Sequence, residues 1–146
     1  MSRCPSRALL PVALGLVVLG TCPGVARAEL PPWVYGDQQR RAPVVVRLRV
    51  LQAERSGSEA RVRGEVRRVW RQPEGLSLKA GQTIGLRYAL APERTPGWAG
   101  PSALPLPRRG EVVNAWLQAI PGTPGEFAPA AGGRSFGPSL ETFQEP

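Results

Sequence analysis

The sequence predicts a small all-β domain, a five-stranded barrel or a sandwich, with loops rich in proline and glycine. Two observations support this fold class. Apolar and charged residues alternate through most of Val44–Leu90, and a period of two is typical of a strand with one buried face. Turn-forming residues separate these segments, with 17 glycines and 17 prolines in 146 residues, as expected for short strands joined into a barrel or a sandwich.

Residues 1–28 are expected to be a secretory signal peptide. A basic start precedes the apolar run Leu9–Leu19, and Ala26 and Ala28 provide the small residues of a cleavage site after Ala28. The apolar run has 11 residues, whereas a membrane-spanning helix needs about 20. We therefore expect a secreted or periplasmic protein whose mature chain has no transmembrane helix.

The alternative is a lipoprotein that is acylated at Cys22. Thr21 is poorly suited to the position before such a cysteine, so cleavage after Ala28 is preferred. Cys4 and Cys22 are the two cysteines of the sequence, and the mature chain would therefore have no disulfide. Three arginines leave with the signal peptide, which lowers the formal net charge from +8 to +5.

The segment 29–43 is a proline-rich lead-in to the barrel. Trp33 and Tyr35 lie in its stretch PPWVYG and form a candidate N-terminal aromatic anchor. Such rings either pack on the barrel or bind a partner, and we expect packing. No amphipathic helix is predicted here or elsewhere in the chain.

The barrel domain is predicted over residues 44–140 and begins with a β-hairpin. Its first strand covers Val44–Ala53, and the alternation resumes in Ala60–Val66. The turn Glu54–Glu59 lies between them, with Gly57 at its middle.

Arginines dominate the outer face of this hairpin. Glu65 is expected opposite Arg47 or Arg49, where opposite charges stabilise a cross-strand pair. The alternation then slips by one residue, and a β-bulge near Arg67 and Arg68 would absorb the slip. Such bulges are common in barrels.

Two further strands and a short closing strand complete the predicted barrel. Thr83–Leu90 alternates with apolar residues on its inner side, and Glu111–Ile120 is the fourth strand. A helix is the alternative for Glu111–Ile120, but its valines and tryptophan favour a strand. The closing strand is expected around Phe136, and residues 141–146 are expected to be a flexible tail.

The segment Ala91–Gly110 contains five prolines and cannot be a central strand, because proline lacks the required N–H. Loops of this length are often functional. The candidate recognition residues are Pro96, Trp98 and Pro101, since tryptophan is enriched in binding hot spots. In the alternative, which we prefer, the loop crosses an open barrel end and Trp98 plugs it.

The order of these elements resembles secreted OB-like five-stranded barrels, including netrin-like modules related to metalloproteinase inhibitors. The likeness covers about Val44–Gln118 and includes the stretches GLSLKAGQTIGLRY and RRGEVVNAWLQ. The netrin-like inhibitors have a cysteine at the mature N-terminus and disulfides in the barrel, whereas Glu29 is the first residue expected here. Metalloproteinase inhibition is therefore not inferred. The whole chain is also similar to small secreted bacterial proteins.

Several kinds of chemistry are excluded by composition. The sequence has no histidine, and the predicted mature chain has no cysteine, so the usual ligands of zinc, copper, haem and iron–sulfur clusters are missing. Ser-His-Asp and Cys-His catalysis are excluded for the same reason. We therefore expect no catalytic residues, no metal and no cofactor. A hydrolase that uses two converging carboxylates is the third functional hypothesis.

The first functional hypothesis is a secreted or periplasmic, non-enzymatic binding module with an unknown protein partner or an envelope polyanion as its ligand. The alternative is an envelope accessory protein that binds a polyanionic glycan or a membrane surface through an arginine-rich strand face. The residues of this candidate basic face are Arg47, Arg49, Arg61, Arg63 and Arg67. An ordinary solvated face would show the same pattern. No nucleic acid is expected, because single-strand binders place aromatic rings beside the basic groove.

Overall fold

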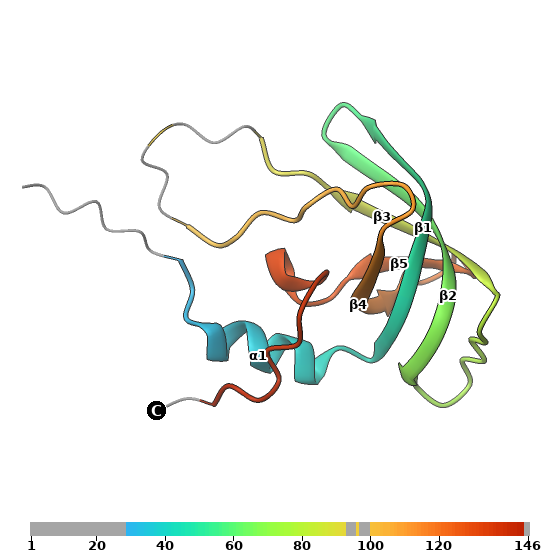
Figure 1. Ribbon diagram of the computed structural model, residues 1–146, viewed down its shortest axis with the longest axis horizontal. Helices are drawn as coiled ribbons and strands as arrows, with labels where there is room; N and C mark the ends of the chain where they lie inside the picture. Colours follow the sequence, from blue (N-terminus) through green and yellow to red (C-terminus); the bar gives the residue numbers. More distant parts are fainter. Residues whose placement is uncertain (1–28, 93–95, 97–99, 145–146) are drawn as a thin grey trace, which may run out of the picture.

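The computed structural model describes residues 29–92, 96 and 100–144 (Figure 1). The expected signal peptide, with Cys22 and the cleavage position after Ala28, lies outside the described residues, and so does Trp98. The elements in chain order are α1 (Pro32–Arg41), β1 (Val44–Ser56), β2 (Glu59–Arg71), β3 (Thr83–Ala89), β4 (Val112–Ala119), β5 (Glu126–Pro129) and the 3-10 helix η1 (Gly132–Arg134).

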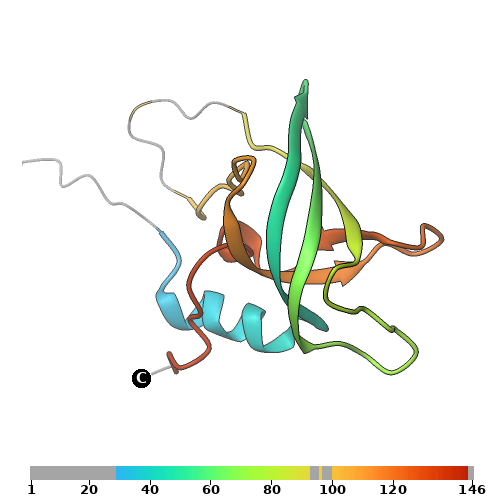
Figure 2. The ribbon, with the colours of Figure 1, turned by 45° about the vertical axis from the view of Figure 1, so that its right-hand side comes forward.

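The five strands form a closed barrel in the order β1-β2-β3-β5-β4, and β4 pairs back with β1. β3 and β5 are parallel, and the other neighbours are antiparallel. β1 and β2 form a long, curved hairpin, and α1 lies near the barrel end away from the hairpin turn (Figures 1 and 2). The predicted fold class, a small five-stranded barrel, is confirmed.

In β1, β2 and β3, the residues of the barrel core are those that the alternation marks as inward. Val46, Leu48 and Val50 of β1 are buried, whereas Arg47 and Arg49 between them are exposed. The other strands contribute Ala60, Val62, Val66, Ile84, Leu86, Tyr88, Val113, Ala115, Leu117 and Phe127. Each large aliphatic side chain stabilises the fold by about 1.5–3 kcal/mol when it is fully buried.

The hairpin turn consists of two residues, because Ser56 pairs with Glu59. Gly57 has a positive φ of 60°, which glycine adopts readily. A first register shift follows at Leu51, and beyond it Arg49 pairs with Glu65. This pairing confirms the opposition of charges that the sequence predicted.

A second register shift confirms the predicted bulge. Leu48 pairs with Val66 and Arg47 with Arg68, so Arg67 is the additional residue of β2. The bulge leaves both Arg67 and Arg68 exposed on the outer face. Consecutive residues of a regular strand point to opposite faces, so the bulge is what permits two adjacent arginines there.

Helix α1 corrects the prediction that the chain has no helix. Pro32 is in its first turn, where a missing N–H costs little. Tyr35 and Gln39 are one turn apart on its buried side. Because Gln39 is polar, the buried side is not a continuous row of apolar residues, and such a row is the signal by which amphipathic helices are predicted. The amide of Gln39 donates to the carbonyl of Arg134 at 2.9 Å and accepts from the N–H of Leu140 at 2.6 Å.

The closing strand also differs from the prediction. β5 is formed by Glu126–Pro129, whereas Phe136 makes only an isolated bridge with Ala115. Phe127 is the one fully buried residue of this short strand, so no alternation was visible among the flanking glycines and prolines. Phe136 is nevertheless buried, with its ring centroid 5.7 Å from that of Tyr88.

The described part of the long loop is attached to the barrel. The Tyr88 hydroxyl donates to the carbonyl of Pro105 at 2.8 Å, and burial raises the pKa of Tyr88 above its usual value, which keeps this donor protonated. Leu104 and Leu106 pack against the core. The N–H of Ser102 donates to the hydroxyl of Tyr35 at 2.8 Å. The loop therefore joins α1 to the sheet.

Candidate anion-binding face

Two neighbouring strands, β1 and β2, place arginines side by side on the outside of the barrel, and β4 lies along the other side of β1. In one row across the sheet, Arg47 lies between Arg68 on β2 and Asn114 on β4. In the next row, Arg49 lies between Glu65 on β2 and Val112 on β4. Side chains directly opposite each other on antiparallel strands are only about 4.5–5.5 Å apart at Cβ.

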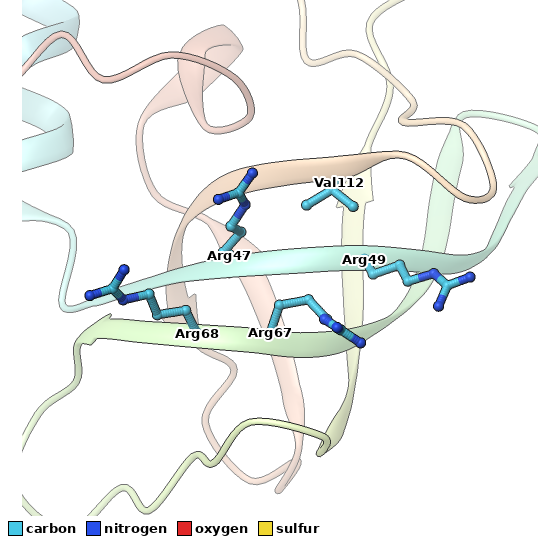
Figure 3. Close-up of a pocket in the computed structure, with 5 residues that line it drawn as sticks. All are labelled: Arg47, Arg49, Arg67, Arg68 and Val112. Atoms are coloured by element: carbon cyan, nitrogen blue, oxygen red, sulfur yellow. The ribbon is translucent and has the colours of Figure 1, made fainter.

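These rows surround a shallow hollow of about 510 Å³ (Figure 3). We call it the arginine hollow, and its lining residues are Arg47, Arg49, Arg67, Arg68 and Val112. Figure 3 shows that the four guanidinium groups spread outward from the strands. They are therefore accessible from solvent.

Carboxylates are scarce at the arginine hollow. Arg67 donates from Nη1 to Oε1 of Glu65 at 2.9 Å. Within the described part of the chain, Arg47, Arg49 and Arg68 make no ion pair or side-chain hydrogen bond. Like charges on adjacent strands repel each other, so an anion bound here would lower the energy of the face.

The remaining residues of the candidate basic face have different surroundings. Arg61 lies 3.4 Å from the Glu59 carboxylate, which is also 3.4 Å from Arg87. Arg63 lines a separate hollow of about 240 Å³ together with Glu126 and other residues. The structure therefore divides the candidate basic face between two places.

Arg71, the last arginine of the hairpin, belongs to the framework of the fold. Its Nη1 donates to the carbonyls of Gln39, Arg40 and Ala42 at 2.9–3.0 Å, which include the free carbonyls at the end of α1. Its Nη2 donates to both carboxylate oxygens of Glu141 at 3.1 and 3.2 Å. These partners are remote in sequence, and no local pattern indicated them.

Glu141 is also held by Trp116, whose indole Nε1 donates to its Oε1 at 2.9 Å. Glu141 lies in the segment 141–146 that was expected to be a flexible tail. These hydrogen bonds attach it to β2 and β4.

A second hollow of about 280 Å³ adjoins the first along the same strands. We call it the tryptophan hollow, and its lining residues are Val45, Trp70, Arg71, Asn114, Trp116, Ser139 and Glu141. Trp70 is 46% exposed. It is the unpaired residue at a third register shift, between the pairs Val46–Val69 and Val45–Arg71.

The two hollows are neighbours because of the strand register. Asn114, which lines the tryptophan hollow, pairs directly with Arg47 of the arginine hollow. From the sequence, no aromatic ring is expected beside the basic face. The third register shift leaves Trp70 unpaired and exposed, and it lines the hollow that contains Asn114, the cross-strand partner of Arg47.

The other candidate residues lie away from this face or outside the described residues. Tyr35 is 2% exposed and Trp33 is half-buried, both on α1. Pro96 and Pro101 are exposed. Trp98 lies outside the described residues, so its position in the loop is not described.

Two searches of the described residues concern other kinds of site. Among them, no three or more histidine, cysteine, aspartate or glutamate residues are grouped so as to hold a metal ion. None of the helices formed by these residues has the length and apolar character needed to cross a membrane.

Comparison with known proteins assigns no family. No model of a known protein family matches the chain, and no curated protein is found to be similar to it.

Proposed function

We propose that this protein is a secreted or periplasmic, non-enzymatic binding module that holds polyanions in its arginine hollow. One observation carries the proposal. Arg47, Arg49 and Arg68 project from adjacent strands, and no described carboxylate forms an ion pair with any of them, although Glu65 is the cross-strand neighbour of Arg49. A solvated face would gain from interleaved carboxylates, and this part of the face has only Glu65.

Arginine is well suited to such binding. Its planar guanidinium presents paired N–H donors to the oxygens of a sulfate, phosphate or carboxylate group. A single exposed ion pair contributes only about 0–1 kcal/mol, so a useful affinity requires several charges on one ligand. Four arginines around one hollow meet this requirement for a polymer with repeated anionic groups.

The test is retention on immobilised heparin as a function of NaCl concentration. The double variant Arg47→Ala/Arg68→Ala should elute at a clearly lower salt concentration than the unchanged protein, because released counterions drive such binding. Arg61→Ala/Arg63→Ala removes the same charge from residues near carboxylates and is the matched control. Equal elution of the two double variants, or retention that does not depend on salt, would refute the proposal.

The location of the protein is part of the proposal. The signal peptide supports it, since Ala26 and Ala28 suit a cleavage site after Ala28. N-terminal sequencing of the exported protein should begin at Glu29. A lipid-modified N-terminus at Cys22 would instead support the lipoprotein alternative.

Three further hypotheses stay predictions. A relationship to the netrin-like group of OB-like barrels is supported by the five-stranded closure and by the order of the strands. Recognition through the loop Ala91–Gly110 would depend on Trp98. The carboxylate hydrolase hypothesis has no specific observation in its favour.

A further inference from the structure

We propose that the polyanion is an acidic polysaccharide, with one sugar ring stacked on Trp70 and the anionic group of a neighbouring sugar bound by Arg47 and Arg68. This inference rests on the proposed polyanion binding and adds the chemical class of the ligand. It depends on the strand register, which pairs Asn114 of the tryptophan hollow with Arg47 of the arginine hollow. Together the two hollows present an aromatic surface, neutral polar groups and free positive charge.

The aromatic surface is the first observation. Trp70 is one of the few exposed large apolar residues of the described chain, and it lines a hollow instead of a convex surface. The C–H faces of a sugar ring are apolar and pack against an indole, while its hydroxyl groups need hydrogen-bond partners. An exposed indole in a polar hollow meets both needs.

The polar groups around Trp70 are the second observation. The side chains of Asn114 and Ser139 line the hollow and have both donor and acceptor capacity. Glu141 is fixed by Arg71 and Trp116, and among the described residues its Oε2 accepts a hydrogen bond from Arg71 alone. A carboxylate oxygen accepts more than one hydrogen bond, so this oxygen has capacity for a sugar hydroxyl.

The distance between the hollows is the third observation. Val45 lines the tryptophan hollow and Arg47 the arginine hollow, and two residues along a strand span roughly 7 Å. A chain that places one ring on Trp70 therefore places its next anionic group over Arg47 and its cross-strand neighbour Arg68.

Other polyanions match these features less well. Polyphosphate has no ring for Trp70, and a flat acidic membrane does not fill two adjoining hollows. Single-stranded nucleic acid would stack on Trp70, but its binding sites place several aromatic rings along the groove for successive bases. Among the described residues, Trp70 is the one exposed aromatic ring that lines either hollow.

The experiment compares ligands of matched charge by isothermal titration with the mature protein. The probes are a heparin oligosaccharide, linear inorganic polyphosphate, oligo-dT and vesicles that contain an acidic phospholipid. Trp70→Ala should weaken oligosaccharide binding ~10-fold, in line with stacking on an aromatic ring, and leave polyphosphate binding unchanged. Trp70→Phe should restore most of the affinity. Phe143→Ala, which removes a ring that is 48% exposed elsewhere, is the matched control.

The outcomes separate this inference from the proposed function. Arg47→Ala/Arg68→Ala should weaken the binding of both oligosaccharide and polyphosphate, and no effect on either would refute polyanion binding itself. Equal effects of Trp70→Ala on both ligands, or no effect, would overturn the polysaccharide inference alone. A larger loss for oligo-dT than for the oligosaccharide, or tight vesicle binding that does not depend on Trp70, would overturn it as well.

Discussion

The two halves of the β1–β2 hairpin carry the same residue type on the same outer face, yet they differ in charge balance. We call the part that lines the arginine hollow the hairpin base, and the part around Arg61 and Arg63 the hairpin tip. At the tip, Glu59 lies 3.4 Å from both Arg61 and Arg87. At the base, Glu65 is 2.9 Å from Arg67. Among the described residues, this is the one ion pair that any of the four arginines of the hollow forms with a carboxylate.

The comparison shows that the number of arginines does not identify a binding face. A strand face in which carboxylates separate the arginines is stabilised across the strands and has little free charge to offer. A face without them stays repulsive until a ligand binds. The positions of Glu59 and Glu65 therefore distinguish the halves better than the arginines do.

The largest effect is expected for Arg71, which follows the base in sequence but belongs to neither half. Arg71→Ala removes donors to three carbonyls and the partner of Glu141. Its loss should lower the free energy of unfolding by about 2–4 kcal/mol, because it leaves a part-buried carboxylate and several carbonyls short of partners. Urea denaturation measures this, with Arg68→Ala as the control. A loss as small as that of the control would refute the structural role.

The next largest stability effect is expected at Gly64, between tip and base. An added Cβ would lie 2.5–2.8 Å from three carbon atoms of the Leu48 side chain in the core. Gly64→Ala should therefore cost about 1–3 kcal/mol through overpacking. Thermal or urea denaturation checks this value. Gly64→Ala/Leu48→Ala should cost less than the sum of the two single losses, and simple additivity would show that the two residues do not compete for space.

A smaller effect is expected on ligand affinity when a carboxylate is removed from the base or from the tip. Glu65→Gln removes the carboxylate at the base and should strengthen heparin oligosaccharide binding ~3-fold, as expected for one exposed charge pair of under 1 kcal/mol. Glu59→Gln makes the same change at the tip and should have less effect. Titrations at two salt concentrations would show this, and a greater gain from Glu59→Gln would assign the ligand to the tip.

The smallest effect is a gain in stability when the base is given the charge pattern of the tip. Arg47→Glu places a carboxylate opposite Arg68 and should stabilise the fold by roughly 0.2–1 kcal/mol at low salt. The gain should shrink as salt screens the charges, while heparin retention falls. A loss of stability at low salt would show that the arginines of the base do not repel each other.

Much of the hairpin could be predicted from the sequence because a half-buried strand displays its two faces as an alternation. The inward residues Val46, Leu48 and Val50 followed from that pattern, and so did the position of Glu65 opposite Arg47 or Arg49, of which the register of the structure selects Arg49. The slip of the pattern also predicted the bulge at Arg67. Each of these features depends on residues that are near each other in the chain or across one turn.

The bulge at Leu51 was predictable in principle. Inward residues of both strands, such as Val50 and Val62, have even numbers. A two-residue turn pairs Ser56 with Glu59, so without a bulge every even-numbered residue of β1 would lie opposite an odd-numbered residue of β2. One strand must then contain an additional residue. The consecutive apolar residues Val50 and Leu51 interrupt the alternation at this position, and beyond them the odd-numbered Ala53 packs against the core.

The sequence by itself determined where the strands between Val44 and Leu90 run and which of their side chains face the core, because burial of alternate residues is a local requirement. Only the tertiary structure decided the burial of Gln39, the pairing of Phe127 in β5 and the attachment of Glu141 to Arg71 and Trp116. It also decided that Trp70 lines a hollow together with Asn114, the cross-strand partner of Arg47. Each of these depends on a partner that the chain brings close only when the barrel closes.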